Sequence, residues 1–289
     1  MATAADWLEG ARLRTLPAAV APVLVGTGAA AQVGSAHPWR ALLAAGVALS
    51  FQVGVNFAND YSDGIRGTDT VRTGPPRLTG GGAAAPRTVK LAAFATLGLG
   101  CLLGLVLVIV SQSWWLLLAG AASVIAAWYY TGGSHPYGYI GLGEVFVFVF
   151  FGLLATLGTT WTQAGQLPGT AWLGAVGVGL IACALLMVNN IRDLPTDSQV
   201  GKYTLAVRLG QRRARWVYTA MIITPLILGL AMVAWTPWAL LILLLAPLAL
   251  ALSLRVLGGR TGTDLIVVLR DTGFYELGYG LIALLALAL

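Results

Sequence analysis

Charged residues are scarce in this sequence, and cysteine and histidine are almost absent. Only 10% of the 289 residues are Asp, Glu, Lys or Arg, whereas soluble globular domains average about 25%. Hydrophobic residues make up 58% of the chain and the mean hydropathy is +0.82, which excludes an ordinary soluble domain. Both cysteines fall inside apolar runs, so a disulfide framework is also excluded.

Long apolar runs are what the sequence has in abundance. Several approach the roughly 20 residues that cross a bilayer as a helix. We therefore predict an all-α, polytopic membrane protein, in which one transmembrane domain of residues 1–289 surrounds a central cavity that opens to the cytoplasmic side. The nine expected spans are 16–34, 40–58, 88–110, 114–131, 141–162, 171–191, 215–235, 238–257 and 273–289.

The cations between these runs are distributed unevenly. Every Lys and Arg except Arg40 falls on the side that holds the N-terminus. By the positive-inside rule that side is cytoplasmic, so we expect a multi-pass protein of the cytoplasmic (inner) membrane with its N-terminus inside and its C-terminus outside. The net charge of +6 then reflects topology, and membrane lipid rather than nucleic acid is the expected partner. The acids gather on the same side, which the rule does not require, so we expect the chemistry there.

Two stretches combine acids, amides and cations at the ends of apolar runs. They are NFANDYSDGIRGTDTVRTGPPR, residues 56–77, and NNIRDLPTDSQVGK, residues 189–202. The spacing Asn-x-x-x-Asp occurs in both, as Asn56–Asp60 and as Asn189–Asp193, and it suggests two similar halves that face each other across the cavity. Residues spaced by four or seven share one face of a helix, so each set can point into that cavity.

The residue types in the two stretches suit a divalent metal and a diphosphate. Carboxylate and amide oxygens are the ligands that Mg²⁺ prefers, and Mg²⁺ is often held by one or two carboxylates together with substrate phosphates. Neighbouring cations can hold the diphosphate oxygens. The candidate residues are Asn56, Asn59, Asp60, Asp63, Arg66, Asp69, Arg72, Arg77, Asn189, Asp193, Asp197 and Lys202. The alternative, that the acids only cap helix ends and pair with arginines, is disfavoured because both clusters share one side and one spacing.

A third stretch, YYTGGSHPYGYIGLGE, lies between the fourth and fifth spans. Tyrosines at this depth are typical of an interfacial aromatic belt. The alternative is that Tyr139 and Glu144 line the mouth of the cavity. The sequence leaves both interpretations open.

The three stretches are similar to those of the UbiA superfamily of intramembrane aromatic prenyltransferases, which have nine transmembrane helices and two Asp-rich motifs on the cytoplasmic side. NDYSDGIRGTDTVRTGPPR, PYGYIGLGEVFVFVFFGLLATLGT and NNIRDLPTDSQVGKYTLAVRLG most resemble the 1,4-dihydroxy-2-naphthoate polyprenyltransferases of menaquinone biosynthesis. The resemblance covers nearly the whole chain. The departure is Leu194-Pro195, because proline is expected to end or bend the helix and so to disturb Asp197.

The resemblance implies transfer of a polyprenyl group from polyprenyl diphosphate to 1,4-dihydroxy-2-naphthoate, with loss of CO₂ and diphosphate, to give demethylmenaquinol. It implies Mg²⁺ as cofactor, with the ligands Asp60, Asp63, Asp193, Asp197, Asn56 and Asn189. The four aspartates and Lys202 are the implied catalytic residues, and Arg66 and Arg72 add positive charge for the leaving diphosphate. Arg14 is a candidate partner for the acceptor carboxylate.

Three other functions compete with this one. A related prenyltransferase would use another aromatic acceptor, such as 4-hydroxybenzoate, and only the resemblance of the loop from Gly67 to Arg77 argues against it. A cation-coupled transporter would place ionisable groups near the bilayer midplane, whereas these acids lie at one edge. A phosphatidyl-alcohol transferase would need a D-G-x-x-A-R signature, whereas Asp63-Gly64 is followed by Ile65-Arg66.

Overall fold

The computed structural model describes residues 2–68 and 77–289, and all regular structure in these residues is helical. The all-α prediction is therefore confirmed. The elements are α1 (Ala4–Ala11), η1 (Leu13–Thr15), α2 (Pro17–Gln32), α3 (Pro38–Arg66), α4 (Pro86–Ser111), α5 (Leu116–Tyr129), η2 (Tyr137–Ile140), α6 (Gly143–Val147), η3 (Phe148–Leu154), α7 (Ala155–Ala164), α8 (Gly169–Gln199), α9 (Leu205–Ala231), η4 (Met232–Ala234), η5 (Pro237–Leu245), α10 (Ala246–Leu257) and α11 (Asp264–Ala288).

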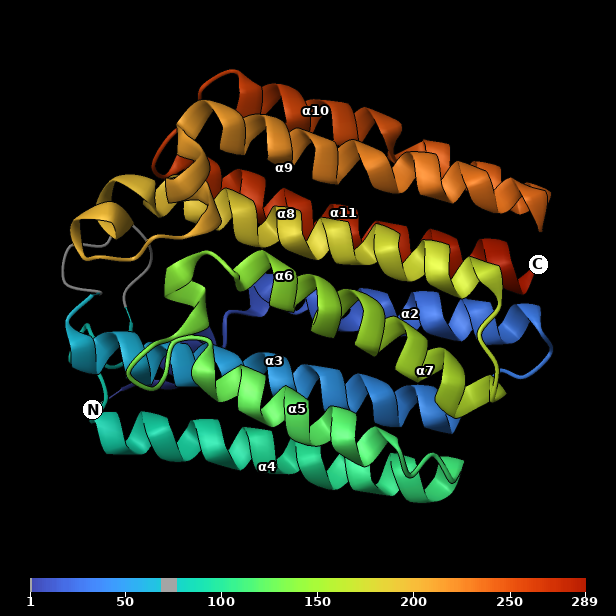
Figure 1. Cartoon of the computed structure of the whole chain (residues 1–289), viewed down its shortest axis with the longest axis horizontal. Coiled ribbons are helices and arrows are strands. Elements are labelled where there is room, and N and C mark those ends of the chain that lie inside the picture. Colours follow the sequence, from blue (N-terminus) through green and yellow to red (C-terminus); the bar gives the residue numbers. More distant parts are fainter. Residues whose placement is uncertain (1, 69–76) are drawn as a thin grey trace.

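The helices run along the long axis of the molecule and their connections gather at its two ends (Figure 1). Helix α1 and the end of α11 lie at opposite ends (Figure 1). Each expected span falls on a helix or on consecutive helices. Within the described residues, six helices are long and apolar enough to cross a membrane, or seven if the pair Ala4–Thr15 and Pro17–Gln32, bent by 44°, forms one span. Helix α5, with 14 residues, and α11 are not in that set.

Proline marks where several helices begin. Pro17, Pro38, Pro86 and Pro237 each stand in the first turn of their helix, where the missing N–H has no partner to lose. Pro195, by contrast, does not end its helix, because α8 continues to Gln199. Of the two expectations for this proline, an end or a bend of the helix, the end is therefore wrong. The last turn is held by other donors, which include the Thr196 hydroxyl on the Asp193 carbonyl at 2.9 Å.

Two helices begin well before the expected spans. Helix α11 starts at Asp264, and α9 starts at Leu205, where the Thr204 side chain caps it by accepting from Val207 N at 3.4 Å. Gly210 interrupts α9 with φ +72°, so the part that matches the expected span follows this break. Charged residues separate these first turns from the apolar runs that follow, Arg208, Arg212 and Arg213 in α9 and Arg270 and Asp271 in α11, so a search for apolar runs missed them.

Helices α6 and α7 form one rod with the segment between them, η3, which is π-helical. Gly152 in this segment packs against Gly179 of α8 so closely that a Cβ added to Gly152 would lie 2.6 Å from the Gly179 Cα. Small residues allow this approach, which supplies dispersion contacts where lipid offers no hydrophobic drive. The rod is thereby fixed on α8.

The largest buried apolar cluster joins α8 to α9, α10 and α11. It includes Tyr218, Ile222, Leu252 and Tyr275, all fully buried. This half of the molecule is solidly packed. The other half, built from α2, α3, α4, α5 and α7 against α8, encloses a cavity instead.

Candidate functional site

The cavity has a volume of about 550 Å³ and is lined by one face of each surrounding helix. Helix α3 contributes residues from Ala44 to Asp63, which at 1.5 Å per residue corresponds to a length of about 28 Å. Aspartates and asparagines lie at the end where α3 and α8 finish, and mainly apolar residues line the remainder, with a few polar ones such as Ser123, Thr159 and Thr162. The molecule therefore offers one polar recess that continues into a long apolar one.

The cavity face of α3 carries Asn56, Asn59 and Asp63. The Asn56 amide donates to the Ala11 carbonyl at 2.9 Å and to the Thr15 hydroxyl at 3.2 Å, which ties α3 to the start of the chain. Asn59 accepts from the Thr131 hydroxyl at 2.8 Å. These contacts fix both amides in place beside the cavity.

Asp60 does not contribute to the cavity wall. Its side chain is fully buried and accepts two backbone hydrogen bonds, from Leu78 N at 2.9 Å and from Thr79 N at 2.8 Å. Each oxygen of this carboxylate therefore accepts one backbone hydrogen bond. In this structure Asp60 fastens the returning chain to α3.

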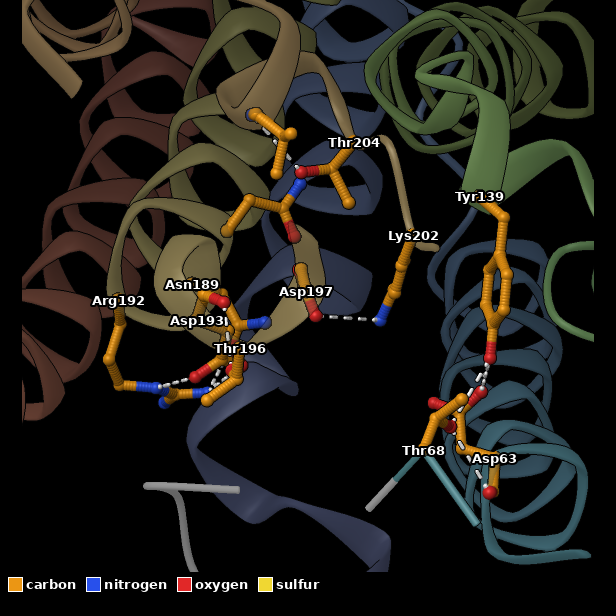
Figure 2. Close-up of polar contacts among 12 residues, drawn as sticks. Asp63, Thr68, Tyr139, Asn189, Arg192, Asp193, Thr196, Asp197, Lys202 and Thr204 are labelled. Atoms are coloured by element: carbon orange, nitrogen blue, oxygen red, sulfur yellow. Dashed lines mark hydrogen bonds and ion pairs between the residues drawn. The ribbon is translucent and has the colours of Figure 1, made fainter. Parts of the chain in front are cut away.

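Asp63 faces the cavity beside Tyr139, and the two side chains meet through their polar ends (Figure 2). The Tyr139 hydroxyl donates to the carboxylate at 2.7 Å. The ring lies between two cations, 5.5 Å from the Arg66 guanidinium and 5.4 Å from the Lys202 ammonium. Burial raises the pKa of Tyr139, and the charge of Asp63 raises it further, so the hydroxyl stays protonated and remains a donor.

Arg66 also donates to the carbonyls of Thr131 and Gly133. These bonds connect the end of α3 to the segment that follows α5. Arg66 does not line the cavity. Its position beside the Tyr139 ring makes it a support for that ring.

The second cluster is built on the last turns of α8 and on the segment after it (Figure 2). Arg192 donates to both oxygens of Asp193, from Nε at 2.7 Å and from Nη2 at 2.6 Å, and to the Asn189 side chain at 2.9 Å. All three residues line the cavity, and Arg192 and Asp193 are buried. A bidentate pair of this kind fixes the orientation of the carboxylate.

Lys202 extends between the two clusters, toward Asp197 (Figure 2). Its ammonium lies 3.8 Å from Asp197 Oδ1, and its backbone N donates to the Asp197 carbonyl at 2.9 Å. Lys202 lines the cavity and Asp197 does not. Asp197 therefore orients a cation that faces the cavity.

Two further predicted residues lie at different depths. Arg14 lines the cavity, where it is paired with Glu9. Glu144 is buried behind the wall, and its Oε1 accepts from Asn190 at 3.1 Å. Its Oε2 has no hydrogen-bond partner among the described residues.

The structure thus divides the predicted site residues. Those that line the cavity are Arg14, Asn56, Asn59, Asp63, Arg77, Asn189, Asp193 and Lys202. Those that stand behind its wall are Asp60, Arg66, Tyr139, Glu144 and Asp197. Asp69 and Arg72 lie outside the described residues. Arg192 and Asn190 line the cavity but were not candidates, although the Asn-Asn-x-Arg-Asp sequence carried the signal.

The carboxylate and amide side chains at the polar end of the cavity are the possible ligands of a metal ion. In residues 2–68 and 77–289, no group of three or more His, Cys, Asp or Glu side chains could hold a metal ion. Asp63 and Asp193 do face the same cavity from two helices, beside amide oxygens. This set does not form a closed protein cage, but it fits the way in which Mg²⁺ is held by one or two carboxylates plus substrate phosphates.

This chain is similar to known prenyltransferases along nearly its whole length. The model of the UbiA prenyltransferase family matches residues 19–269. A 1,4-dihydroxy-2-naphthoate octaprenyltransferase of Mycobacterium tuberculosis is 51% identical over 288 residues, covering 100% of this chain and 98% of the relative. The enzyme of the same name from Mycobacterium leprae is 48% identical, covering 94% and 92%.

A solved structure has the same fold. It is a UbiA homologue from Archaeoglobus fulgidus bound to GPP and Mg²⁺, with a TM-score of 0.68 and 15% identity. The alignment covers 98% of this chain and 100% of that chain.

Proposed function

Because this chain belongs to the UbiA prenyltransferase family, we propose that it transfers a polyprenyl group from polyprenyl diphosphate to 1,4-dihydroxy-2-naphthoate in menaquinone biosynthesis. Diphosphate and CO₂ are released and demethylmenaquinol is formed. The observation that carries the proposal is the single cavity that joins a recess of carboxylates and amides to a long apolar interior. A prenyl diphosphate has the same division into a charged head and an apolar tail.

The diphosphate lies at the polar end, between Asp63 of α3 and Asp193 of α8. Mg²⁺ bound there with the diphosphate would neutralise the charge that develops on the leaving group. Arg77 and Lys202, which line the same end, add positive charge from the protein. The Arg192 pair and the Tyr139 hydroxyl hold the two cavity carboxylates in place.

The reaction breaks the allylic C–O bond, and the bonding electrons leave with the diphosphate. The electron-rich ring carbon that bears the carboxylate then forms the new C–C bond. The carboxylate leaves as CO₂, and its bonding electrons restore the aromatic ring, so charge and atoms balance. The apolar walls keep water from the cationic allyl group. Arg14 is the proposed partner of the acceptor carboxylate before CO₂ leaves.

Five predicted residues act without lining the cavity. Asp60 positions the chain that returns to α3, and Asp197 positions Lys202. Arg66 and Tyr139 support Asp63. Glu144 supports Asn190 at the cavity wall. The candidates Asp69 and Arg72 remain proposed diphosphate contacts.

The proposed setting is the cytoplasmic membrane, crossed nine times by one domain of residues 1–289. The N-terminus and the polar end of the cavity face the cytoplasm, and the C-terminus faces outward. The opposite placement of α1 and the end of α11 supports an odd number of crossings (Figure 1). A cytoplasmic polar end suits a donor and an acceptor that are both anionic.

The test is a reaction of purified protein in detergent with polyprenyl diphosphate, Mg²⁺ and 1,4-dihydroxy-2-naphthoate, with 4-hydroxybenzoate in a parallel reaction. The expected product, followed by mass, is a prenylated naphthoquinol without the carboxylate, and EDTA abolishes its formation. Product from 4-hydroxybenzoate alone would support prenyl transfer but contradict 1,4-dihydroxy-2-naphthoate as the acceptor. Folded protein that makes neither product would overturn the proposal.

A further inference from the structure

Three glycines in the apolar part of the cavity have room for a side chain. They are Gly104 of α4, Gly120 of α5 and Gly158 of α7, and all three line the cavity. A Cβ added to Gly104 or Gly158 would come no closer than 3.8 or 3.9 Å to another described residue. At Gly120 no described heavy atom would lie within 4 Å.

Glycine inside a helix costs about 1 kcal/mol relative to alanine, so its presence needs a reason. Close packing supplies that reason elsewhere. A Cβ on Gly100 would lie 2.7 Å from the Phe51 ring, and one on Gly54 would lie 2.7 Å from Leu97. Helix packing does not require Gly104, Gly120 or Gly158. What their missing side chains provide is space inside the cavity.

The three glycines lie at a similar depth, far from the aspartates. The indoles of Trp115 and Trp161 meet with ring centroids 5.9 Å apart and join α5 to α7 at the far end. By the helical rise, Gly120 is about 7 Å and Gly158 about 5 Å from that contact. Gly104 lies on α4 at a similar level, two turns before the end of that helix.

Hydrogen bonds join the surrounding helices at the end beyond these glycines. Arg40 of α3 donates to the Thr162 carbonyl of α7 at 2.9 Å and to the Val110 carbonyl of α4 at 3.1 Å. Both carbonyls belong to last turns, which lack helical donors. Gln163 adds a bond from its side chain to Thr27 of α2 at 3.0 Å. Four helices are thus tied together at this end.

We propose that Gly104, Gly120 and Gly158 form a chamber for the distal isoprenoid units of the donor and so determine how long a tail fits inside the protein. This inference rests on the proposed function. The nearest neighbour of Gly104 is Val47, sixteen residues before Asp63 on α3, which is a helical distance of about 24 Å. An extended chain advances about 1.2 Å per bond, so an isoprenoid unit of four bonds advances about 5 Å. The chamber is then reached only from about the fifth unit onward.

The test compares donor lengths in variants that fill the chamber. Gly104→Leu and Gly158→Leu place a branched side chain in the space, and kcat/KM is measured with geranyl diphosphate and with octaprenyl diphosphate. We expect the two-unit donor to react within twofold of the wild-type rate. The eight-unit donor should lose at least tenfold in kcat/KM, because its distal units compete with the leucine.

Gly98→Leu is the matched control. Gly98 lies on α4 like Gly104 and also faces open space, but it is exposed on the outer surface and does not line the cavity. We expect this variant to match the wild type with both donors, and all leucine variants to keep the wild-type apparent Tm in detergent. Equal losses of kcat/KM for both donors in Gly104→Leu and Gly158→Leu would contradict the proposed chamber. Unchanged kcat/KM with the long donor in folded variants would contradict it as well. Wild-type protein that transfers no prenyl group would instead overturn the proposed function.

Discussion

The acid-bearing ends of α3 and α8 share the spacing Asn-x-x-x-Asp but use their carboxylates differently. At the end of α8, Asn189 and Asp193 both line the cavity. At the end of α3, Asn56 lines the cavity. Asp60, four residues later, is buried and accepts hydrogen bonds from the backbone N–H groups of Leu78 and Thr79. The equal spacing therefore does not give equal orientation.

The pair on α3 that matches Asn189–Asp193 is Asn59–Asp63, which has the same spacing and the same cavity face. The cavity face of α3 is continuous through Gln52, Asn56, Asn59 and Asp63, and Asp60 lies on its flank. The Asn-x-x-x-Asp pair that faces the cavity on α3 therefore lies three residues after Asn56–Asp60. One carboxylate from each helix faces the cavity.

The largest effect is expected from the two cavity carboxylates. Asp63→Asn and Asp193→Asn should each lower kcat for prenyl transfer by about 10²–10³-fold, because each removes a carboxylate that would hold the Mg²⁺ that neutralises the leaving diphosphate. The rate is measured at saturating Mg²⁺ and donor. Asp193→Asn also leaves the buried Arg192 without its carboxylate, so its apparent Tm falls as well, whereas that of Asp63→Asn does not. Wild-type rates in both variants would remove the carboxylates from the mechanism.

Asp60→Asn should separate stability from chemistry. The amide keeps one acceptor for two backbone donors, so one N–H loses its partner at a cost of about 1–3 kcal/mol. We expect a lower apparent Tm and a KM for the donor that rises about tenfold, with kcat nearly unchanged. The opposite result, a loss of kcat like that of Asp63→Asn at unchanged Tm, would make Asp60 a ligand as the family resemblance implies.

Tyr139→Phe tests the support behind Asp63. The variant loses the hydrogen bond to Asp63, worth about 1 kcal/mol, and the 3.3 Å contact of the same hydroxyl with the Thr68 hydroxyl, so kcat/KM should fall about fivefold, while the ring stays beside Arg66 and Lys202. The ordinary pKa of tyrosine is about 10, and burial beside Asp63 raises the pKa of Tyr139 above that value. The hydroxyl therefore stays protonated below pH 10. The pH profile of the variant should keep the wild-type shape, and a lost basic limb would contradict this assignment.

Pro195→Ala should have the smallest effect on activity. The proline is exposed and lies inside α8, where it removes one helical hydrogen bond to Ile191. Alanine restores that donor and gains up to about 3 kcal/mol of helix propensity, so the apparent Tm should rise. Prenyl transfer should stay within twofold. A large loss of rate would show that the proline sets the position of Asp197.

Much of the fold could be predicted because apolar runs of helical length have few alternatives in a membrane. The site was harder for a physical reason. The partners of Asp60 stand eighteen and nineteen residues later, and the partner of Asn59 is Thr131, so no local spacing shows them. The π-helical turn of η3 likewise leaves no pattern in its apolar sequence, because it depends on packing against α8.

That π-helical turn governs the phase of the rod from Gly143 to Ala164. Its cavity residues form two series, each with a step of four: Phe146, Phe150, Leu154, Gly158 and Thr162, and beside them Val147, Phe151, Ala155 and Thr159. In a straight α-helix four residues turn through about 400°, so four such steps would rotate Thr162 about 160° away from Phe146. The wider turn, bonded from i to i+5, absorbs most of this drift.

The π-helical segment η3 therefore sets the rotation of α6 relative to α7 about their common axis. Deleting a single residue from 148–154 would restore the α-helix and turn one half by about 100° relative to the other. The half that carries Phe146 and Phe150 and the half that carries Gly158 and Thr162 would then no longer face the same cavity. One additional residue keeps both halves of this wall facing the cavity.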